Sequence, residues 1–209
     1  MLQTLLPVNI FNSTLSAARC FCSTDYCPPY GRHIQPLVRL GANERWVMGV
    51  TQLYDEIYVV CHESPSILVY NAQVPFSRLD NVVVKEMKRP LDIVAFWLVT
   101  NGLGDAALHC IYELTADGHI LDKYGGQPGS RDGQLNRSWY LELSDDGKQI
   151  LVTDYDNRRV LILDRQPMRL KRVLLETGGK PFRLFFVRLT DVTRLLIVAG
   201  QSVLVHGLK

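Results

Sequence analysis

The 209-residue sequence has little net charge, an odd number of cysteines and no long apolar run. Its formal net charge of +2 indicates no general electrostatic preference for a partner. No apolar stretch approaches the ~18 residues that a membrane helix needs, and the N-terminus lacks the basic region of a signal peptide. Five cysteines do not form a disulfide framework, so a reducing compartment is the simpler interpretation. We therefore expect a soluble cytoplasmic protein that does not associate with membranes.

The sequence also lacks the motifs that commonly mark catalysis. It contains no G-x-S-x-G nucleophile elbow, no H-E-x-x-H helix and no phosphate-binding G-x-x-x-x-G-K-[ST] loop. One cluster near the N-terminus has ligand types suited to zinc and consists of Cys20, Cys22, Cys27 and His33. Its spacing fits no common zinc finger, so we expect no metal. Because the catalytic motifs are missing as well, we expect a non-enzymatic protein with no cofactor.

What the sequence does contain is a repeat. Four segments share one pattern of an apolar β-rich run, a short polar turn and a second β-rich run, and they span 57–71, 97–114, 150–164 and 195–207. The aligned anchor positions are Val60, Val99, Thr153 and Val198. Their spacings of 39, 54 and 45 residues are close to the ~40–50 residues of a four-stranded propeller blade. The repeat therefore predicts a propeller.

The composition of the runs explains why they should be strands. Valine, isoleucine, leucine, tyrosine and threonine dominate them, and no apolar period of 3.6 persists over three helical turns. Several runs are apolar on both faces, as expected of strands buried between two blades. We predict an all-β fold, a β-propeller of about four blades with up to four antiparallel strands each. The predicted domain covers 36–209, with blades at about 44–86, 90–124, 137–176 and 181–209, and follows a weakly ordered segment at 1–35.

Two blades carry specific expectations about their strands. In the third, residues 139–143 should form the innermost strand, Asp146-Gly147 a tight turn, and the alternating run 168–176 an exposed outer strand. In the second, the run 91–95 continues directly into 96–100 with no turn signal. We therefore expect a missing hairpin between Ala95 and Phe96.

The third predicted blade resembles a repeat of the NHL family over residues 125–164. The matching elements are a Gly-rich lead-in (133–136), the Asp146-Gly147 turn, the strand 150–154 and the motif that names the family (157–160). A looser resemblance covers 37–209. NHL propellers attached to tripartite-motif proteins bind proteins and RNA, so the resemblance implies a binding platform.

A basic stretch is the first candidate for such a platform. Residues 158–194 hold ten Lys or Arg against three Asp or Glu, whereas 100–157 hold four against ten, which suggests faces of opposite sign. The candidate binding residues are Tyr155, Arg158, Arg159, Arg169 and Arg172. Alternation should send one of Arg158 and Arg159 toward solvent, while Asp154 and Asn157 should hydrogen-bond the turn backbone.

The sequence thus favours a non-enzymatic binding module with a protein partner, and RNA as the second choice. The alternative is a calcium-dependent lactonase-like hydrolase, for which Asn101, Glu142 and Asp154 could be imagined as ligands. Closure of the propeller is a separate question. The strand 36–40 should complete the last blade, which otherwise ends at its third strand, and an open ring would invite self-association.

Overall fold

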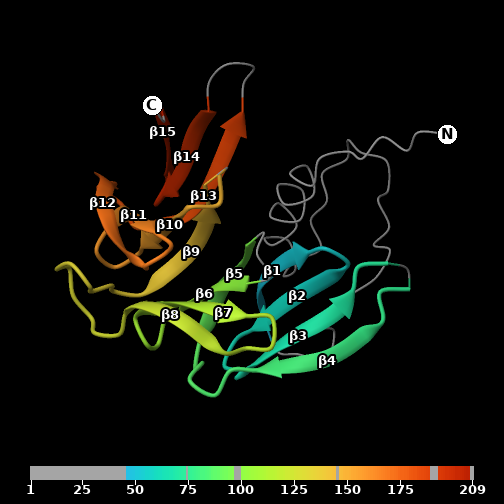
Figure 1. Cartoon of the computed structure of the whole chain (residues 1–209). Helices are drawn as coiled ribbons and strands as arrows, with labels where there is room; N and C mark the ends of the chain where they lie inside the picture. Colours follow the sequence, from blue (N-terminus) through green and yellow to red (C-terminus); the bar gives the residue numbers. More distant parts are fainter. Residues whose placement is uncertain (1–45, 74, 97–99, 145, 189–192, 208–209) are drawn as a thin grey trace.

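The computed structural model describes residues 46–73, 75–96, 100–144, 146–188 and 193–207. The regular structure in these ranges is entirely β, with fifteen strands in four antiparallel sheets (Figure 1). Each sheet uses consecutive strands and forms one blade of an open propeller. The predicted fold class is therefore confirmed.

The strands of each blade follow one another in chain order from the centre outward. The first blade consists of β1 (Val47–Leu53), β2 (Glu56–Cys61), β3 (Ser66–Asn71) and β4 (Arg78–Val83). The second consists of β5 (Pro90–Phe96), β6 (Thr100–Asp105), β7 (Cys110–Thr115) and β8 (Ile120–Gly125). The third consists of β9 (Ser138–Leu143), β10 (Gln149–Asp154), β11 (Arg159–Asp164) and β12 (Arg169–Glu176). The fourth consists of β13 (Pro181–Arg188), β14 (Thr193–Ala199) and β15 (Ser202–Gly207).

The core lies between the blades, and the middle strands of the third blade contribute to two parts of it. Leu161 and Leu163 of β11 pack toward the second blade, whereas Val160 and Ile162 of the same strand pack toward the fourth. Successive side chains of a strand point to opposite faces, so a blade with neighbours on both sides must be apolar on both faces. This requirement explains the continuous apolar runs of the sequence.

The second blade differs from the expectation, because β5 and β6 do form a hairpin, with Phe96 paired opposite Thr100. The prediction of a missing hairpin is wrong. Glycines at 102 and 104 lower the strand propensity of β6, so the sequence pattern did not indicate this strand. Gly104, and not Val99, is the position equivalent to Thr153, since each precedes the last residue of its second strand. With this correction the repeat spacings become 44, 49 and 45 residues.

Several predictions fall on residues outside the described ranges. They are the weakly ordered segment 1–35, the strand 36–40 and the cluster of three cysteines with His33. Within the described ranges, no helix is long and apolar enough to cross a membrane.

Candidate functional site

Every blade brings the start of its first strand beside the turn between its second and third strands. The amide after the second strand donates to the carbonyl before the first strand in all four blades, at 2.8 to 3.2 Å. The four lead-in residues that supply these carbonyls are Trp46, Arg89, Arg137 and Lys180. We call the end of the blades formed by these residues and the turns 62–65, 106–109, 155–158 and 200–201 the cavity face.

Immediately after the lead-in residue, each first strand loses its regular pairing with the second strand. The irregularities include those between Val47 and Gly49, between Pro90 and Asp92, and between Pro181 and Arg183, and a matching one separates Ser138 from Leu141. A β-bulge of this kind redirects the side chains beside it. The equivalent positions that follow the four bulges are Gly49, Asp92, Tyr140 and Arg183.

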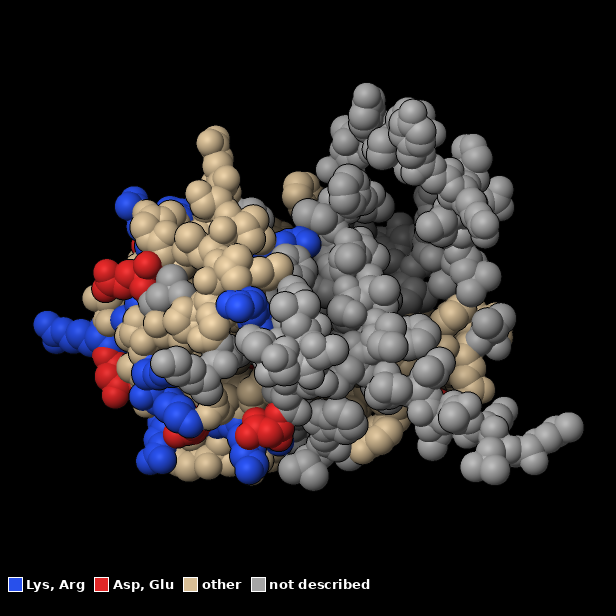
Figure 2. All heavy atoms as spheres, turned by 90° about the horizontal axis from the view of Figure 1, so that it is seen from above, with Lys and Arg blue, Asp and Glu red and all other residues tan. Residues whose placement is uncertain are grey.

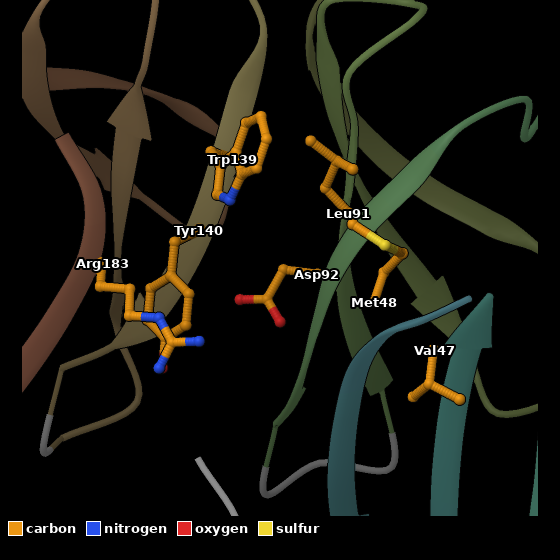
Figure 3. A pocket seen from close by; sticks show the side chains of 7 residues that line it. All are labelled: Val47, Met48, Leu91, Asp92, Trp139, Tyr140 and Arg183. Carbon is orange, nitrogen blue, oxygen red and sulfur yellow. The ribbon is translucent and has the colours of Figure 1, made fainter. Parts of the chain in front are cut away.

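These bulges surround a cavity of about 210 Å³ to which all four first strands contribute. It is lined by Val47, Met48, Leu91, Asp92, Trp139, Tyr140 and Arg183 (Figure 3). In Figure 3 the aromatic residues and Arg183 lie on one side, and Asp92 with the apolar residues on the other. The cavity therefore combines an apolar wall, two aromatic rings and both signs of charge.

Asp92 is the acidic residue of this cavity, and it contacts the backbone of the neighbouring blades. The residue is 1% exposed, and its Oδ2 accepts a hydrogen bond from the Leu141 amide of the third blade at 3.0 Å. On the opposite side β1 packs directly against it, because a Cβ at Gly49 would lie only 2.9 Å from the Asp92 Cα and Oδ1 atoms. Asp92 thus joins the first strands of three neighbouring blades.

An aromatic and charged cluster adjoins the cavity on the cavity face. The rings of Trp139 and Tyr155 lie 4.9 Å apart, and Lys180 Nζ lies 4.8 Å from the Tyr155 ring centroid. Lys180 Nζ also donates to Asp156 Oδ1 at 2.5 Å, and Arg137 Nε lies 3.5 Å from Asp156 Oδ2. This arrangement is a cation–π contact whose cation also has a carboxylate partner.

Asp154 and Asn157 do bond backbone groups, but these groups belong to the loop before the third blade and not to the turn that the sequence predicted. Asp154 is 0% exposed and accepts hydrogen bonds from the Asn136 amide, Asn157 Nδ2 and Arg159 Nε, each at 2.7 Å. Asn157 Nδ2 also donates to the Gly129 carbonyl at 2.7 Å. These contacts fix the glycine-rich loop that leads into the third blade.

The structure separates the five candidate binding residues. Tyr155 and the exposed Arg158 lie on the cavity face. The sequence had predicted that one of Arg158 and Arg159 would face solvent. Arg159 is buried and donates to the Ser130 and Gln134 carbonyls in addition to Asp154. Arg169 and Arg172 are exposed on the outer strand β12, where Arg169 lies opposite Asp164, at the end of the blade remote from Arg158. The five residues do not form one surface.

The three residues that the hydrolase hypothesis named as calcium ligands also lie apart. Glu142 pairs opposite Leu151 whereas Asp154 pairs opposite Ser138, a separation of roughly 10 Å along the strand. Asn101 lies in β6 of the neighbouring blade. Among the described residues, no group of three or more His, Cys, Asp or Glu side chains is placed to hold a metal ion.

The charge split along the sequence is partly cancelled in space. Arg165 of the basic stretch pairs with Glu113 of the acidic stretch at 2.8 Å, and Lys180 pairs with Asp156. Figure 2 shows Lys and Arg interspersed with Asp and Glu over the part of that view that is not grey. The basic stretch is therefore not one continuous basic surface.

The sequence interpretation missed the cavity residues Asp92, Trp139, Tyr140 and Arg183. A signal was present, because Arg89-Pro90-Leu91-Asp92 and Lys180-Pro181-Phe182-Arg183 share a basic residue and a proline. These two segments occupy equivalent positions in their blades. Recognising them as first strands would have shown that Asp92 and Arg183 hold equivalent positions in their strands.

Comparison with known proteins supports the fold. No protein-family model and no curated protein sequence matches the chain. The computationally designed Ika4 protein is similar with a TM-score of 0.59 and 13% identity, over 84% of this chain and 99% of its own. Hydrazine synthase of Kuenenia stuttgartiensis is similar with a TM-score of 0.61 and 12% identity, over 78% of this chain and 46% of its own. A protein of unknown function from Bacteroides thetaiotaomicron is similar with a TM-score of 0.55 and 13% identity, over 71% of this chain and 44% of its own.

At these identities the similarity shows the fold alone. The chain spans almost the full length of the designed protein but less than half of the other two. The chain therefore has an all-β fold whose four antiparallel sheets are arranged as in an open β-propeller.

Proposed function

We propose that this chain is a non-enzymatic binding module whose cavity face holds a protein partner. The observation that carries the proposal is the convergence of all four first strands on one cavity lined by Trp139, Tyr140 and Arg183. Trp, Tyr and Arg are the residue types that most often dominate protein–protein binding energy. Trp46, which is 69% exposed on the same face, adds a fourth such residue.

Two observations favour a protein over RNA as the partner. First, carboxylates lie among the cations of the cavity face, since Asp156 contacts both Arg137 and Lys180, and a phosphate backbone would be repelled by them. Second, among the candidate arginines Arg159 is buried, and Arg158 and Arg169 lie at opposite ends of the third blade. RNA binding draws on several unpaired cations along one track, and a protein partner needs no such track.

We also propose that the blades of this chain are NHL repeats. Support comes from the hydrogen-bonding of Asp154, Asn157 and Arg159, the residues on which the sequence resemblance rests. Asp105 ends the second strand of its blade as Asp154 does, and it accepts from the amides of Lys88, Arg89 and Ala107. The same use of an aspartate at the same position is what a shared repeat predicts.

The experiment compares capture of partners by wild-type chain and by two double variants. Trp46→Ala with Arg158→Asn changes the cavity face, and asparagine suits Arg158 because that residue has a φ of 56°. Arg172→Ala with Val173→Ala changes the exposed outer strand β12 and serves as the matched control. Captured proteins are then purified, and their direct binding is measured by calorimetry after nuclease treatment.

The expected result is a partner that binds wild type and the β12 variant equally and loses about tenfold or more in affinity for the cavity-face variant. Equal binding to all three chains would contradict the proposed site. Loss of all binding after nuclease treatment would favour RNA and overturn the choice of a protein partner.

A further inference from the structure

We propose that the central cavity receives a carboxylate of an acidic segment of the partner, and that Arg183 is the residue that binds it. This inference rests on the proposed function and specifies the chemistry of its ligand. It assigns a recognition role to a residue of the basic stretch 158–194 that is not among the five candidate binding residues.

The Arg183 guanidinium is the accessible charge of the cavity. The residue is half-buried in the cavity wall, and no described residue forms a hydrogen bond or ion pair with its guanidinium. A guanidinium stays protonated and offers five donors in a planar fork that matches a carboxylate. In a partly enclosed site its attraction for an anion is stronger than in bulk water.

Trp139 supplies a second donor on the same side of the cavity. Its indole ring is half-buried and held by the Tyr155 ring, and its nitrogen forms no hydrogen bond to another described residue. Figure 3 shows this nitrogen on the lower edge of the ring in that view, in the direction of Asp92 and Tyr140. The guanidinium and the indole N–H line one small cavity, and a carboxylate can accept hydrogen bonds from both.

Asp92 does not make the cavity a cation site. Asp92 is 1% exposed, and its Oδ2 already accepts from the Leu141 amide, so it offers a partner much less accessible charge than the half-buried Arg183. Its negative charge repels an incoming anion, and it repels a doubly charged phosphate more strongly than a singly charged carboxylate. The cavity therefore suits a single carboxylate better than a doubly charged phosphate.

The size of the cavity and its surroundings favour a peptide segment. A volume of about 210 Å³ is below the ~300 Å³ at which drug-sized ligand pockets begin, so it fits one side chain. The neighbouring cations Arg89, Arg137 and Lys180 already have acidic partners. A nucleic acid would find few unpaired cations there, whereas a peptide needs only the one in the cavity.

The test uses defined probes on the full chain. Fluorescein-labelled hexaglutamate, hexaglutamine and an oligouridylate of the same length are titrated by fluorescence anisotropy against wild type, Arg183→Leu, Arg183→Lys and the matched exposed control Arg172→Leu. Far-ultraviolet circular dichroism and thermal melts report the folding of each variant. In parallel, the indole N–H signals of wild-type protein are followed by NMR during hexaglutamate addition, with Trp139→Phe identifying the Trp139 signal.

The expected result is hexaglutamate binding at least about tenfold stronger than hexaglutamine or oligouridylate binding, reduced about tenfold by Arg183→Leu. Arg183→Lys should retain part of this affinity, Arg172→Leu should retain all of it, and the Trp139 indole signal should shift. If Arg183→Leu does not fold, the Trp139 shift and the Arg183→Lys variant decide the question.

Three outcomes would overturn the inference: no hexaglutamate binding, unchanged binding by Arg183→Leu, or an oligouridylate preferred over hexaglutamate. A partner that still distinguishes the cavity-face variant from the β12 variant would leave the proposed function intact in the first two cases. Loss of that distinction would remove the proposed function as well, so the two failures can be told apart.

Discussion

Arg165 and Glu113 form a buried ion pair that joins the third blade to the second. Arg165 Nε donates to Glu113 Oε1 at 2.9 Å and Nη2 lies 2.8 Å from the same oxygen. The two side chains are 7% and 1% exposed. Arg165 directly follows β11, whereas Glu113 lies in the middle of β7. The contact therefore connects segments from the basic and the acidic stretch of the sequence across a blade interface.

Glu113→Ala is expected to destabilise the chain by about 3–5 kcal/mol, because it leaves the Arg165 guanidinium buried without its counter-charge. Urea unfolding followed by circular dichroism measures the change. Asp164→Ala is the control, since Asp164 is 29% exposed and pairs with the exposed Arg169, and such a solvent-accessible pair is worth at most about 1 kcal/mol. The double variant Glu113→Ala with Arg165→Leu should recover part of the loss. Equal effects of the two single variants would contradict this account.

Gly49→Ala is expected to destabilise the junction of the first two blades by about 1–3 kcal/mol. The added Cβ would lie 2.9 Å from the Asp92 Cα, which is backbone and cannot rotate away. Gly179→Ala is the matched control, because its Cβ would approach no atom closer than 3.4 Å. Thermal melts of the two variants provide the comparison, and a control as unstable as Gly49→Ala would refute the steric explanation.

Cys110 is expected to resist alkylation in the folded chain. Burial raises the pKa of its thiol from the ordinary value of 9.0 to about 11, and the thiolate is the reactive form. At pH 8 its reaction with iodoacetamide, followed by mass spectrometry of the Cys110 peptide, should be about a hundredfold slower than in denaturing urea. A comparable rate in both conditions would show that the thiol is accessible and ionised.

The same pKa shift has a consequence for stability at high pH. The unfolded thiol loses its proton at a lower pH than the folded thiol. The contribution of Cys110 to stability is therefore complete below about pH 9 and is lost as the pH rises toward about 11. Burial raises the pKa of Tyr112 in the same direction. Urea unfolding should thus give a free energy that falls above pH 9, and Cys110→Ala should fall less steeply.

The candidate arginines are expected to differ in their effect on partner binding. Arg158→Glu reverses a charge on the cavity face and should weaken binding of the partner about tenfold, because it adds a carboxylate close to Asp156. Arg169→Glu with Arg172→Glu changes only the outer strand and should leave binding within about twofold of wild type. Calorimetry with the purified partner distinguishes them. A stronger effect of the β12 variant would move the binding surface to that strand.

The sequence by itself determined the fold class and most of the strands. Runs that are apolar on both faces can be satisfied only between two sheets, and β11 shows this by sending Val160 and Leu161 to different cores. A backbone contact of Asp154 was predicted for its own turn, whereas the amide that it accepts from belongs to Asn136 of the preceding loop. The second hairpin was missed since two glycines gave β6 a weak strand signal.

The tertiary structure alone decided the site. Asp92, Trp139 and Arg183 come from three different blades, and their distance depends on how the blades pack and on the bulge in each first strand. No local pattern carries that information, because strand periodicity fixes which face a side chain takes but not which blade lies opposite. For the same reason, the sequence did not predict the positions of Arg159 and Arg165. Their basic side chains lie buried against carboxylates that the linear charge pattern had assigned to a separate face.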